Sequence, residues 1–319
     1  MITPALLVVL GFACLIFGGN WLVDGASALA KRNNISDLVI GLTIVSFGTS
    51  APELVVNSMA SFDGHSDIVF GNIIGSNNFN LFVILGISAL IYPITVQTTT
   101  IRREIPISLV ATLVLLLLAN DFFIDLETEA SRIDGVILLL LFLFFLYYVF
   151  MQQKVDRAEV ITYKSKKVPN FKIWSFIILG VLGLMLGGKL VVDNSVEIAT
   201  KLGVSQKIIG LTIVALGTSL PELVTSVIAA IKKNSDIAIG NVIGSNIFNI
   251  LLIVGVSAIV SPINFSKEFN QDIYILIGGT VFLILAMFMG KKGKLDRWEA
   301  FILLAFYLAY TTYLVSLEV

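Results

Sequence analysis

The stretch GLTIVSFGTSAPELV occupies residues Gly41–Val55 and returns as GLTIVALGTSLPELV at Gly210–Val224. Each copy places a glutamate, Glu53 or Glu222, inside an apolar run long enough to cross a lipid bilayer. A carboxylate at membrane depth is costly and is therefore a functional-site candidate. Two of them in related sequence settings suggest a pair that holds a cation between the halves of a repeat.

The composition is that of a polytopic helical membrane protein. Of the 319 residues, 57% are hydrophobic and 13% are charged, and the mean hydropathy is +0.95. A net charge of −1 gives no basic field for nucleic acid. The single cysteine, Cys14, cannot form an internal disulfide, and with His65 as the only histidine a zinc site of the usual kind is not expected. We find no nucleophile–base pair or cofactor motif, so we expect neither an enzyme nor a cofactor.

Apolar runs separated by charged breaks predict an all-α membrane protein with ten transmembrane helices. We expect the first run to be a true span rather than a signal peptide, because no basic residue precedes it. The predicted spans are Pro4–Val23, Leu38–Ser61, Asp67–Ile91, Ile105–Ala119, Ile133–Met151, Ile173–Val192, Ile208–Ile231, Ile237–Val260, Ile273–Met289 and Trp298–Leu317.

The distribution of basic residues between the loops predicts the orientation. Alternate loops, including those with Lys31 and Lys232, carry 16 of the 21 Lys and Arg residues. Because cytoplasmic loops retain positive charge, we expect a multi-pass protein of the cell membrane with both termini outside. The external loop Asp121–Asp134 is then acidic; we favour an ordinary solvated loop over a cation-attracting vestibule.

The repeat extends well beyond the opening motif. At an offset of 169 residues, 13 of the 20 positions in Gly41–Ala60 and 16 of the 28 in Asp67–Ile94 are identical to their counterparts. Spans one to five therefore match spans six to ten, and five is an odd number. The second half must enter the membrane upside down, which is the inverted-topology repeat of many secondary transporters. We divide the chain into a first five-helix repeat (1–151), a cytoplasmic linker (152–172) and a second repeat (173–319).

Both glutamates lie about 15 residues into their spans, which at about 1.5 Å per residue places them near the middle of the membrane. Each follows a proline, Pro52 or Pro221, that leaves the carbonyl four residues back without its helical partner. The hydroxyls one turn before each glutamate are expected on the same helix face. In the neighbouring spans, residues four apart also share a face: Ser76 with Asn80, and Ser245 with Asn249.

The resulting inventory of carboxylates, hydroxyls, amide oxygens and backbone carbonyls is a hard-oxygen set. It suits Ca²⁺ or Na⁺ better than Mg²⁺, which requires a rigid octahedron, and it suits zinc or copper poorly. For each Ser or Thr hydroxyl, bonding back to its own helix remains an equal alternative. For Asn72, Asn77, Asn241 and Asn246 we favour hydrogen bonds between helices over ion ligation. We expect Gly18, Gly19, Gly187 and Gly188 to permit close helix packing.

The paired motifs GTSAPEL with GNIIGSNNFN, and GTSLPEL with GNVIGSNIFN, resemble the two α-repeats of the sodium/calcium exchangers in the cation/Ca²⁺ antiporter superfamily. The resemblance covers nearly all ten spans. It implies inverted five-helix repeats around a cluster of cation sites, with the first and sixth helices sliding across the other eight. The linker of about 20 residues is too short for the cytosolic sensing domains of animal exchangers, so the chain resembles a minimal microbial member.

The resemblance also implies roles for individual residues. Glu53 and Glu222 would be central ligands for both ions, with Ser50 and Ser245 at one flanking Na⁺ site and Ser219 and Ser76 at its mirror image. Carbonyls of Thr49 and Thr218 would bind Ca²⁺, carbonyls of Ser46 and Ala215 would bind Na⁺, and Asn80 and Asn249 would complete the middle. Some relatives place an aspartate where Asn249 stands. With two acids rather than three, a potassium requirement is not expected, and a third Na⁺, as the family's stoichiometry implies, leaves the site net positive.

Three functions remain open from the sequence. The first is antiport of Na⁺ and Ca²⁺ by alternating access, electrogenic, with the two ions and the lipid bilayer as partners and a monomer as the functional unit. In the second, protons drive the exchange, because two nearby carboxylates titrate as a coupled pair. The third is a cation channel, which inverted repeats and broken helices disfavour.

Overall fold

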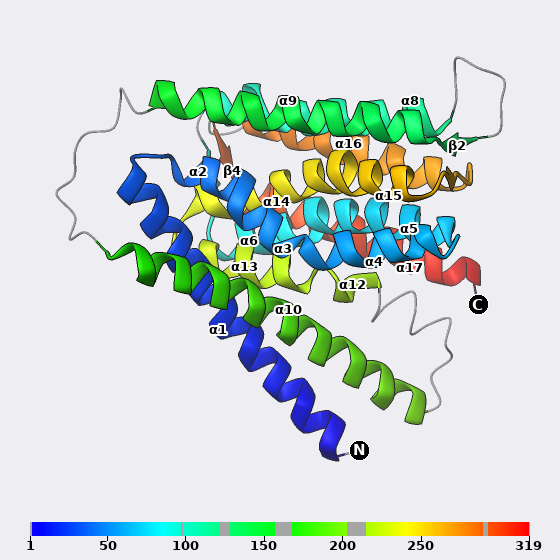
Figure 1. Ribbon diagram of the computed structural model, residues 1–319, viewed down its shortest axis with the longest axis horizontal. Coiled ribbons are helices and arrows are strands. Elements are labelled where there is room, and N and C mark those ends of the chain that lie inside the picture. Colours follow the sequence, from blue (N-terminus) through cyan, green and yellow to red (C-terminus); the bar gives the residue numbers. More distant parts are fainter. Residues whose placement is uncertain are drawn as a thin grey trace.

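The computed structural model describes residues 2–96, 98–120, 128–156, 168–202, 215–289 and 293–318, and the chain is mostly helical. Figure 1 shows a bundle of roughly aligned helices crossed by a long, sloping pair. Within the described residues, six helices are long and apolar enough to cross a membrane. A seventh candidate is the pair Asp37–Thr49 and Ala51–Phe62, which bends by 49° at Ser50. The fold is thus that of a multi-pass helical membrane protein.

The first half of the chain follows the predicted segments, with the second and third divided into shorter pieces. Each contains a π-helical stretch, a local widening that is common at functional sites. The elements are α1 (Ile2–Asn33), α2 (Asp37–Ile40), η1 (Gly41–Val45), α3 (Ser46–Thr49), α4 (Ala51–Phe62), α5 (Ser66–Asn78), η2 (Phe79–Ile84), α6 (Leu85–Ile91), β1 (Ile94–Thr95), α7 (Thr98–Arg102), α8 (Glu104–Ala119), β2 (Glu129–Ala130) and α9 (Arg132–Asp156).

The second half repeats this order as far as it is described. The predicted span Ile208–Ile231 lies partly outside the described residues, as does the first half of the acidic loop at 121–134. The elements are α10 (Asn170–Lys201), α12 (Ala215–Gly217), α13 (Leu220–Ile231), α14 (Ser235–Ile247), η4 (Phe248–Val254), α15 (Gly255–Val260), β3 (Ile263–Asn264), α16 (Phe269–Met289), β4 (Lys294–Leu295) and α17 (Arg297–Glu318).

The helices α1 and α10 are longer than the spans predicted for them. Each has 32 residues, or about 48 Å, against about 30 Å of hydrocarbon in a bilayer. The predicted spans Pro4–Val23 and Ile173–Val192 ended where charged residues begin. The helices continue through those residues because hydropathy marks the apolar part of a helix and not its end.

Contact between α1 and α10 is backbone to backbone, as glycine allows. A Cβ on Gly18 would lie 2.8 Å from the carbonyl oxygen of Gly180, and one on Gly187 would lie 2.7 Å from that of Gly11. As the residue number rises along α1, the contacted residue number falls along α10, so these two equivalent helices run antiparallel (Figure 1). Close packing is confirmed for Gly18, Gly19 and Gly187, whereas Gly188 makes only ordinary contact with Pro221.

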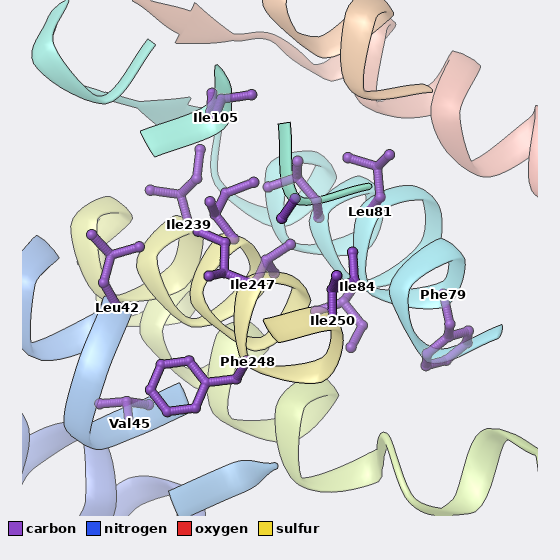
Figure 2. Close-up of a cluster of buried hydrophobic side chains, with 14 of the residues drawn as sticks. Leu42, Val45, Phe79, Leu81, Ile84, Ile105, Ile239, Ile247, Phe248 and Ile250 are labelled. Carbon is purple, nitrogen blue, oxygen red and sulfur yellow. The ribbon is translucent and has the colours of Figure 1, made fainter. Parts of the chain in front are cut away.

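The core of the bundle is built around the third and eighth predicted spans. In the chain of α14, η4 and α15, 83% of the most apolar window is buried inside the protein, and the same fraction holds for α5, η2 and α6. Figure 2 shows α14 and η4 at the centre of this cluster, between the second and third predicted spans; the labelled residues include Leu42, Val45, Leu81, Ile84, Ile239, Ile247, Phe248 and Ile250.

Two short β-ribbons join connections from different halves. Ile94 and Thr95 of β1 pair antiparallel with β4, and Glu129 and Ala130 of β2 pair antiparallel with β3. The strands β2 and β4 lie at opposite ends of the bundle (Figure 1). The starting residues of β1 and β3, Ile94 and Ile263, are also separated by the repeat offset.

Candidate cation-binding site

Both glutamates lie in the first turn of a helix that begins at a break. Ser50 and Ser219, the residues before α4 and α13, have nearly identical backbone angles (φ −85°, ψ 6° and φ −86°, ψ 4°). A proline follows in the first turn of each helix, where its missing N–H is tolerated. The positive end of the helix dipole favours a carboxylate at this position. The sequence therefore forms two matching half-helices, each with its glutamate at the amino end.

The carboxylates are buried and interact with each other. Glu53 and Glu222 are each 1% exposed, and their carboxylates lie close enough to repel each other electrostatically. The ion pairs formed by the described residues, such as Lys232 with Asp24, include neither of them. Two buried acids with this little charge compensation are costly, and a bound cation would offset that cost.

A serine from one motif contacts the glutamate of the other. The hydroxyl of Ser50 donates to Oε1 of Glu222 over 2.8 Å, and the Ser245 hydroxyl lies 3.5 Å from the same oxygen. Helical periodicity placed Ser50 on the face of Glu53 in its own span. The helix breaks at Ser50, and this hydroxyl contacts the opposite half of the protein; the face that it shares with Glu53 stays a prediction.

The structure brings together the serine pairs that the family resemblance implied. Ser50 lies 3.1 Å from Ser245, and Ser219 lies 3.0 Å from Ser76, measured between hydroxyl oxygens. All four serines are at least 97% buried. Their role as Na⁺ ligands stays a prediction.

The other hydroxyls near the glutamates are engaged in hydrogen bonds. The Thr49 hydroxyl lies 3.1 Å from Oδ1 of Asn241 and also bonds back to Ser46. The Thr218 hydroxyl lies 3.5 Å from Oδ1 of Asn72, and the Ser46 hydroxyl donates to the Gly41 carbonyl over 2.7 Å. Ala215 begins α12.

Several buried oxygen atoms lack a hydrogen-bond partner among the described residues, and those on the candidate site residues are Oε2 of Glu53, Oε2 of Glu222, Oδ1 of Asn80 and Oδ1 of Asn249. Leaving a buried acceptor unpaired costs about 1–3 kcal/mol for each group. A hard cation is a suitable partner for such oxygens, which belong to the set preferred by Ca²⁺.

Asn77, Asn241 and Asn246 bridge helices, as predicted, whereas Asn72 accepts from Ser76 in its own helix and lies 3.5 Å from the Thr218 hydroxyl. Asn77 and Asn246 each donate to the other's backbone carbonyl over 3.3 Å, joining α5 to α14. Asn241 donates to the Ser226 hydroxyl on α13 over 2.9 Å. Sequence reasoning missed a further pairing, in which Asn77 and Asn246 also accept from the middle asparagines. The N-x-x-N spacing in both motifs is the signal that indicates it.

Some buried polar groups outside this cluster were also missed by sequence reasoning. Glu104, at the start of α8, is fully buried and accepts a hydrogen bond from the hydroxyl of Tyr148 over 2.7 Å. Tyr310 donates to Asp272 across α16 and α17. Both acids lie at the beginning of a helix, where charge is common, and the sequence therefore did not distinguish them from interfacial residues.

Broken apolar helices around a buried cluster of carboxylate, hydroxyl and amide oxygens define a helical membrane protein suited to handling hard cations. The family model described as sodium/calcium exchanger protein matches residues 3–151 and 172–316. The chain belongs to the sodium/calcium exchanger family.

Full-length relatives support this membership. CaxA of Alkalimonas amylolytica is 36% identical over 321 residues, which cover 99% of this chain and 100% of the relative. The sodium/calcium exchanger MaX1 of Methanosarcina acetivorans is 32% identical, with 96% of each chain covered.

The fold matches solved structures of an exchanger. The sodium/calcium exchanger from Methanococcus jannaschii has a TM-score of 0.83 to this structure at 32% identity, covering 98% of each chain. The exchanger NCX_Mj soaked with 10 mM Na⁺ and without Ca²⁺ has a TM-score of 0.84 at 33% identity, covering 97% of each chain.

Proposed function

We propose that this protein exchanges Na⁺ for Ca²⁺ across the cell membrane as a secondary active antiporter. One observation carries the proposal: two interacting buried carboxylates and two amide oxygens, contributed equally by the two repeats, have unpartnered oxygens that a hard cation would satisfy. Ca²⁺ and Na⁺ are similar in size and both accept irregular oxygen cages. Competition for one cage couples the two ions, because neither can occupy it while the other is bound.

The architecture we propose has ten spans in two inverted five-helix repeats, residues 1–151 and 173–319, joined by a cytoplasmic linker at 152–172. The 169-residue offset, the antiparallel crossing of α1 with α10 and the matching breaks at Ser50 and Ser219 support it. The short α8 and the broken span containing α13 complete the count. The distribution of basic residues places both termini outside.

Within the cage, we assign Glu53 and Glu222 to both ions and the Thr49 and Thr218 carbonyls to Ca²⁺. Each serine pair, with a carbonyl from Ser46 or Ala215, belongs to a flanking Na⁺ site. Asn80 and Asn249 face the middle. Alternating access follows if one group of helices moves against the rest around this midplane site, and exchange of more than two Na⁺ for one Ca²⁺ makes transport electrogenic.

Transport assays in proteoliposomes test this function. Vesicles loaded with Na⁺ should accumulate ⁴⁵Ca²⁺ when external Na⁺ is removed, and a K⁺-loaded control should not. Accumulation should increase when a valinomycin-clamped potential makes the interior more positive, because the inward movement of Ca²⁺ accompanies a larger outward movement of Na⁺ charge. No Na⁺-dependent uptake in either condition would overturn the proposal.

A proton-driven exchanger is the second candidate, favoured by the interaction of the two buried carboxylates, since such a pair can share a proton. It predicts ⁴⁵Ca²⁺ uptake driven by a pH gradient in vesicles free of Na⁺. The two drivers are separated by imposing each gradient alone on the same preparation. Ca²⁺ flux that follows its own gradient at channel rates, with neither counter-ion, would indicate a pore instead.

A further inference from the structure

The buried asparagines of the two repeats form a closed hydrogen-bond network across α5–η2 and α14–η4. Nδ2 of Asn80 donates to Oδ1 of Asn246 over 3.0 Å, and Nδ2 of Asn249 donates to Oδ1 of Asn77 over 3.0 Å. Nδ2 of Asn77 and of Asn246 each donate to the backbone carbonyl of the other over 3.3 Å. All four side chains are at least 98% buried.

The backbone dictates which way each amide in the network faces. A carbonyl oxygen only accepts hydrogen bonds, so the carbonyl of Asn246 requires the NH₂ group of Asn77 on that side. Oδ1 of Asn77 is then the atom left to face Asn249. Asn249 must present its own NH₂ group there, which turns its oxygen to the opposite side. The same sequence of constraints runs from the Asn77 carbonyl through Asn246 to Asn80.

The oxygens turned outward by this network are unpartnered. Oδ1 of Asn80 and Oδ1 of Asn249 have no hydrogen bond among the described residues. Each lies about one turn beyond a serine of the candidate site, Ser76 or Ser245, and the Ser245 hydroxyl reaches the Glu222 carboxylate. The network therefore presents two amide oxygens, and no NH₂ group, on the side of the glutamates.

Orientation matters here because an asparagine side chain carries both an acceptor oxygen and a donor NH₂ group. In an unconstrained cage, two carboxylates would attract its NH₂ group, and the resulting hydrogen bond would compete with a cation for the acids. Fixing the NH₂ group elsewhere removes this competitor. We propose that Asn77 and Asn246 are positioning residues, which hold Asn80 and Asn249 as obligate oxygen ligands and so set the cation affinity of the cage. This inference rests on the proposed function of the same site.

The test compares Asn77→Leu and Asn246→Leu with Asn78→Leu. Asn78 is the adjacent residue of α5, is 97% buried and donates only to the backbone carbonyl of Asp272, away from the glutamates. Loss of a residue that orients a metal ligand typically weakens affinity by about 10- to 100-fold. We expect the Ca²⁺ concentration for half-maximal ⁴⁵Ca²⁺ uptake to rise by this factor in the first two variants, and by less than about twofold in the control.

A double-variant cycle separates orientation from a structural contribution. If Asn77 acts through Asn249, then Asn77→Leu should change Ca²⁺ affinity by less than about twofold in a protein that already carries Asn249→Leu. The thermal midpoint of unfolding without ions, measured in parallel, should fall by similar amounts for Asn77→Leu and Asn78→Leu, since each loses buried hydrogen bonds.

The outcomes distinguish the two proposals. Wild-type vesicles without Na⁺-dependent Ca²⁺ uptake would overturn the proposed function. Wild-type uptake combined with equal affinities for Asn77→Leu and Asn78→Leu, or with an undiminished effect of Asn77→Leu in the Asn249→Leu protein, would overturn the positioning role alone. If Asn77→Leu does not fold, Asn77→Ser and Asn246→Ser, which fit the same space, serve as the alternative pair.

Discussion

The two serine clusters of the site share a sequence motif but end their hydrogen-bond chains on different groups. In the first cluster, the Ser50 hydroxyl donates to the Glu222 carboxylate over 2.8 Å. In the mirror cluster, Ser219 donates to Ser76, and Ser76 lies 3.1 Å from Oδ1 of Asn72. One proton therefore points at an acid and the other at an amide. An inverted repeat can thus present two chemically different flanking sites at one moment.

The residues around the two clusters also differ at one equivalent position. Asn241, the counterpart of Asn72, uses its NH₂ group on the Ser226 hydroxyl and its oxygen on Thr49. The position equivalent to Ser226 is Asn57, which donates to the Glu53 carbonyl in its own helix. The oxygen of Asn72 lies 3.1 Å from the Ser76 hydroxyl and 3.5 Å from the hydroxyl of Thr218, the counterpart of Thr49. The two repeats thus differ in an exchange of serine for asparagine one turn from each glutamate and in the partner of the serine proton, whereas both retain the contact between threonine and asparagine.

Removing either acid should have the largest effect, because both serine clusters belong to a site built around the same two carboxylates. We expect Glu53→Gln and Glu222→Gln each to lower Na⁺-dependent ⁴⁵Ca²⁺ uptake by about 100-fold or more, since ligand charge governs Ca²⁺ affinity. Glu104→Gln is the matched control, a buried glutamate at the start of another helix. Uptake that survives both site variants would refute the ligand assignment.

Removing one serine at a time should reveal the asymmetry in the protein without ions. Ser50→Ala loses a hydrogen bond to a carboxylate, worth about 1.5–3 kcal/mol, whereas Ser219→Ala loses one between neutral groups, worth about 0.5–1.5 kcal/mol. The unfolding midpoint in buffer without Na⁺ and Ca²⁺ should therefore fall further for Ser50→Ala. Added Ca²⁺ should reduce the difference between the two unfolding midpoints, because the ion replaces the hydroxyl as partner of Glu222. Equal midpoints without ions would contradict the asymmetry.

The smallest expected effect comes from making the clusters more alike. Asn72→Leu removes the acceptor of the Ser76 proton, which is then free to turn toward a site carboxylate and compete with a cation. We expect the apparent Ca²⁺ affinity to weaken by about two- to fivefold, corresponding to about 0.5–1 kcal/mol of competing hydrogen bond. Asn78→Leu controls for the loss of a buried amide on the same helix. An unchanged or increased affinity would show that Asn72 does not direct this proton.

The sequence was sufficient to predict the helical membrane fold, because apolar length and periodic breaks follow from bilayer thickness. It predicted the paired glutamates for the same reason: a carboxylate such as Glu53 stands out against an apolar background. It did not predict the ends of α1, which extends to Asn33 through interfacial residues where hydropathy is uninformative. It also did not predict that Ser50 donates to Glu222 of the other half, because the spacing within one span carries no information about contacts between halves.

The sequence does not indicate which way the asparagine amide groups point. The spacing of Asn77 and Asn80 indicates a shared face, but whether an amide presents its oxygen or its NH₂ group depends on backbone carbonyls of another helix. Such information arises only when α5 and α14 are brought together in space.

The two β-ribbons hold connections of the helix bundle together at its two ends. One joins the connection after α6 to the connection before α17, with an extra bond from the Val96 amide to the Gly293 carbonyl. The other joins the segments before α9 and α16, reinforced from Phe265 to Thr128. Neither ribbon includes α1 or α10. Opening the bundle at either end would break the backbone hydrogen bonds of a ribbon. The glycine-lined pair α1–α10 is instead attached to the bundle by side-chain contacts, such as Lys232 with Asp24 and Asn234 with Ser27, so a movement of this pair would break those contacts and leave both ribbons closed.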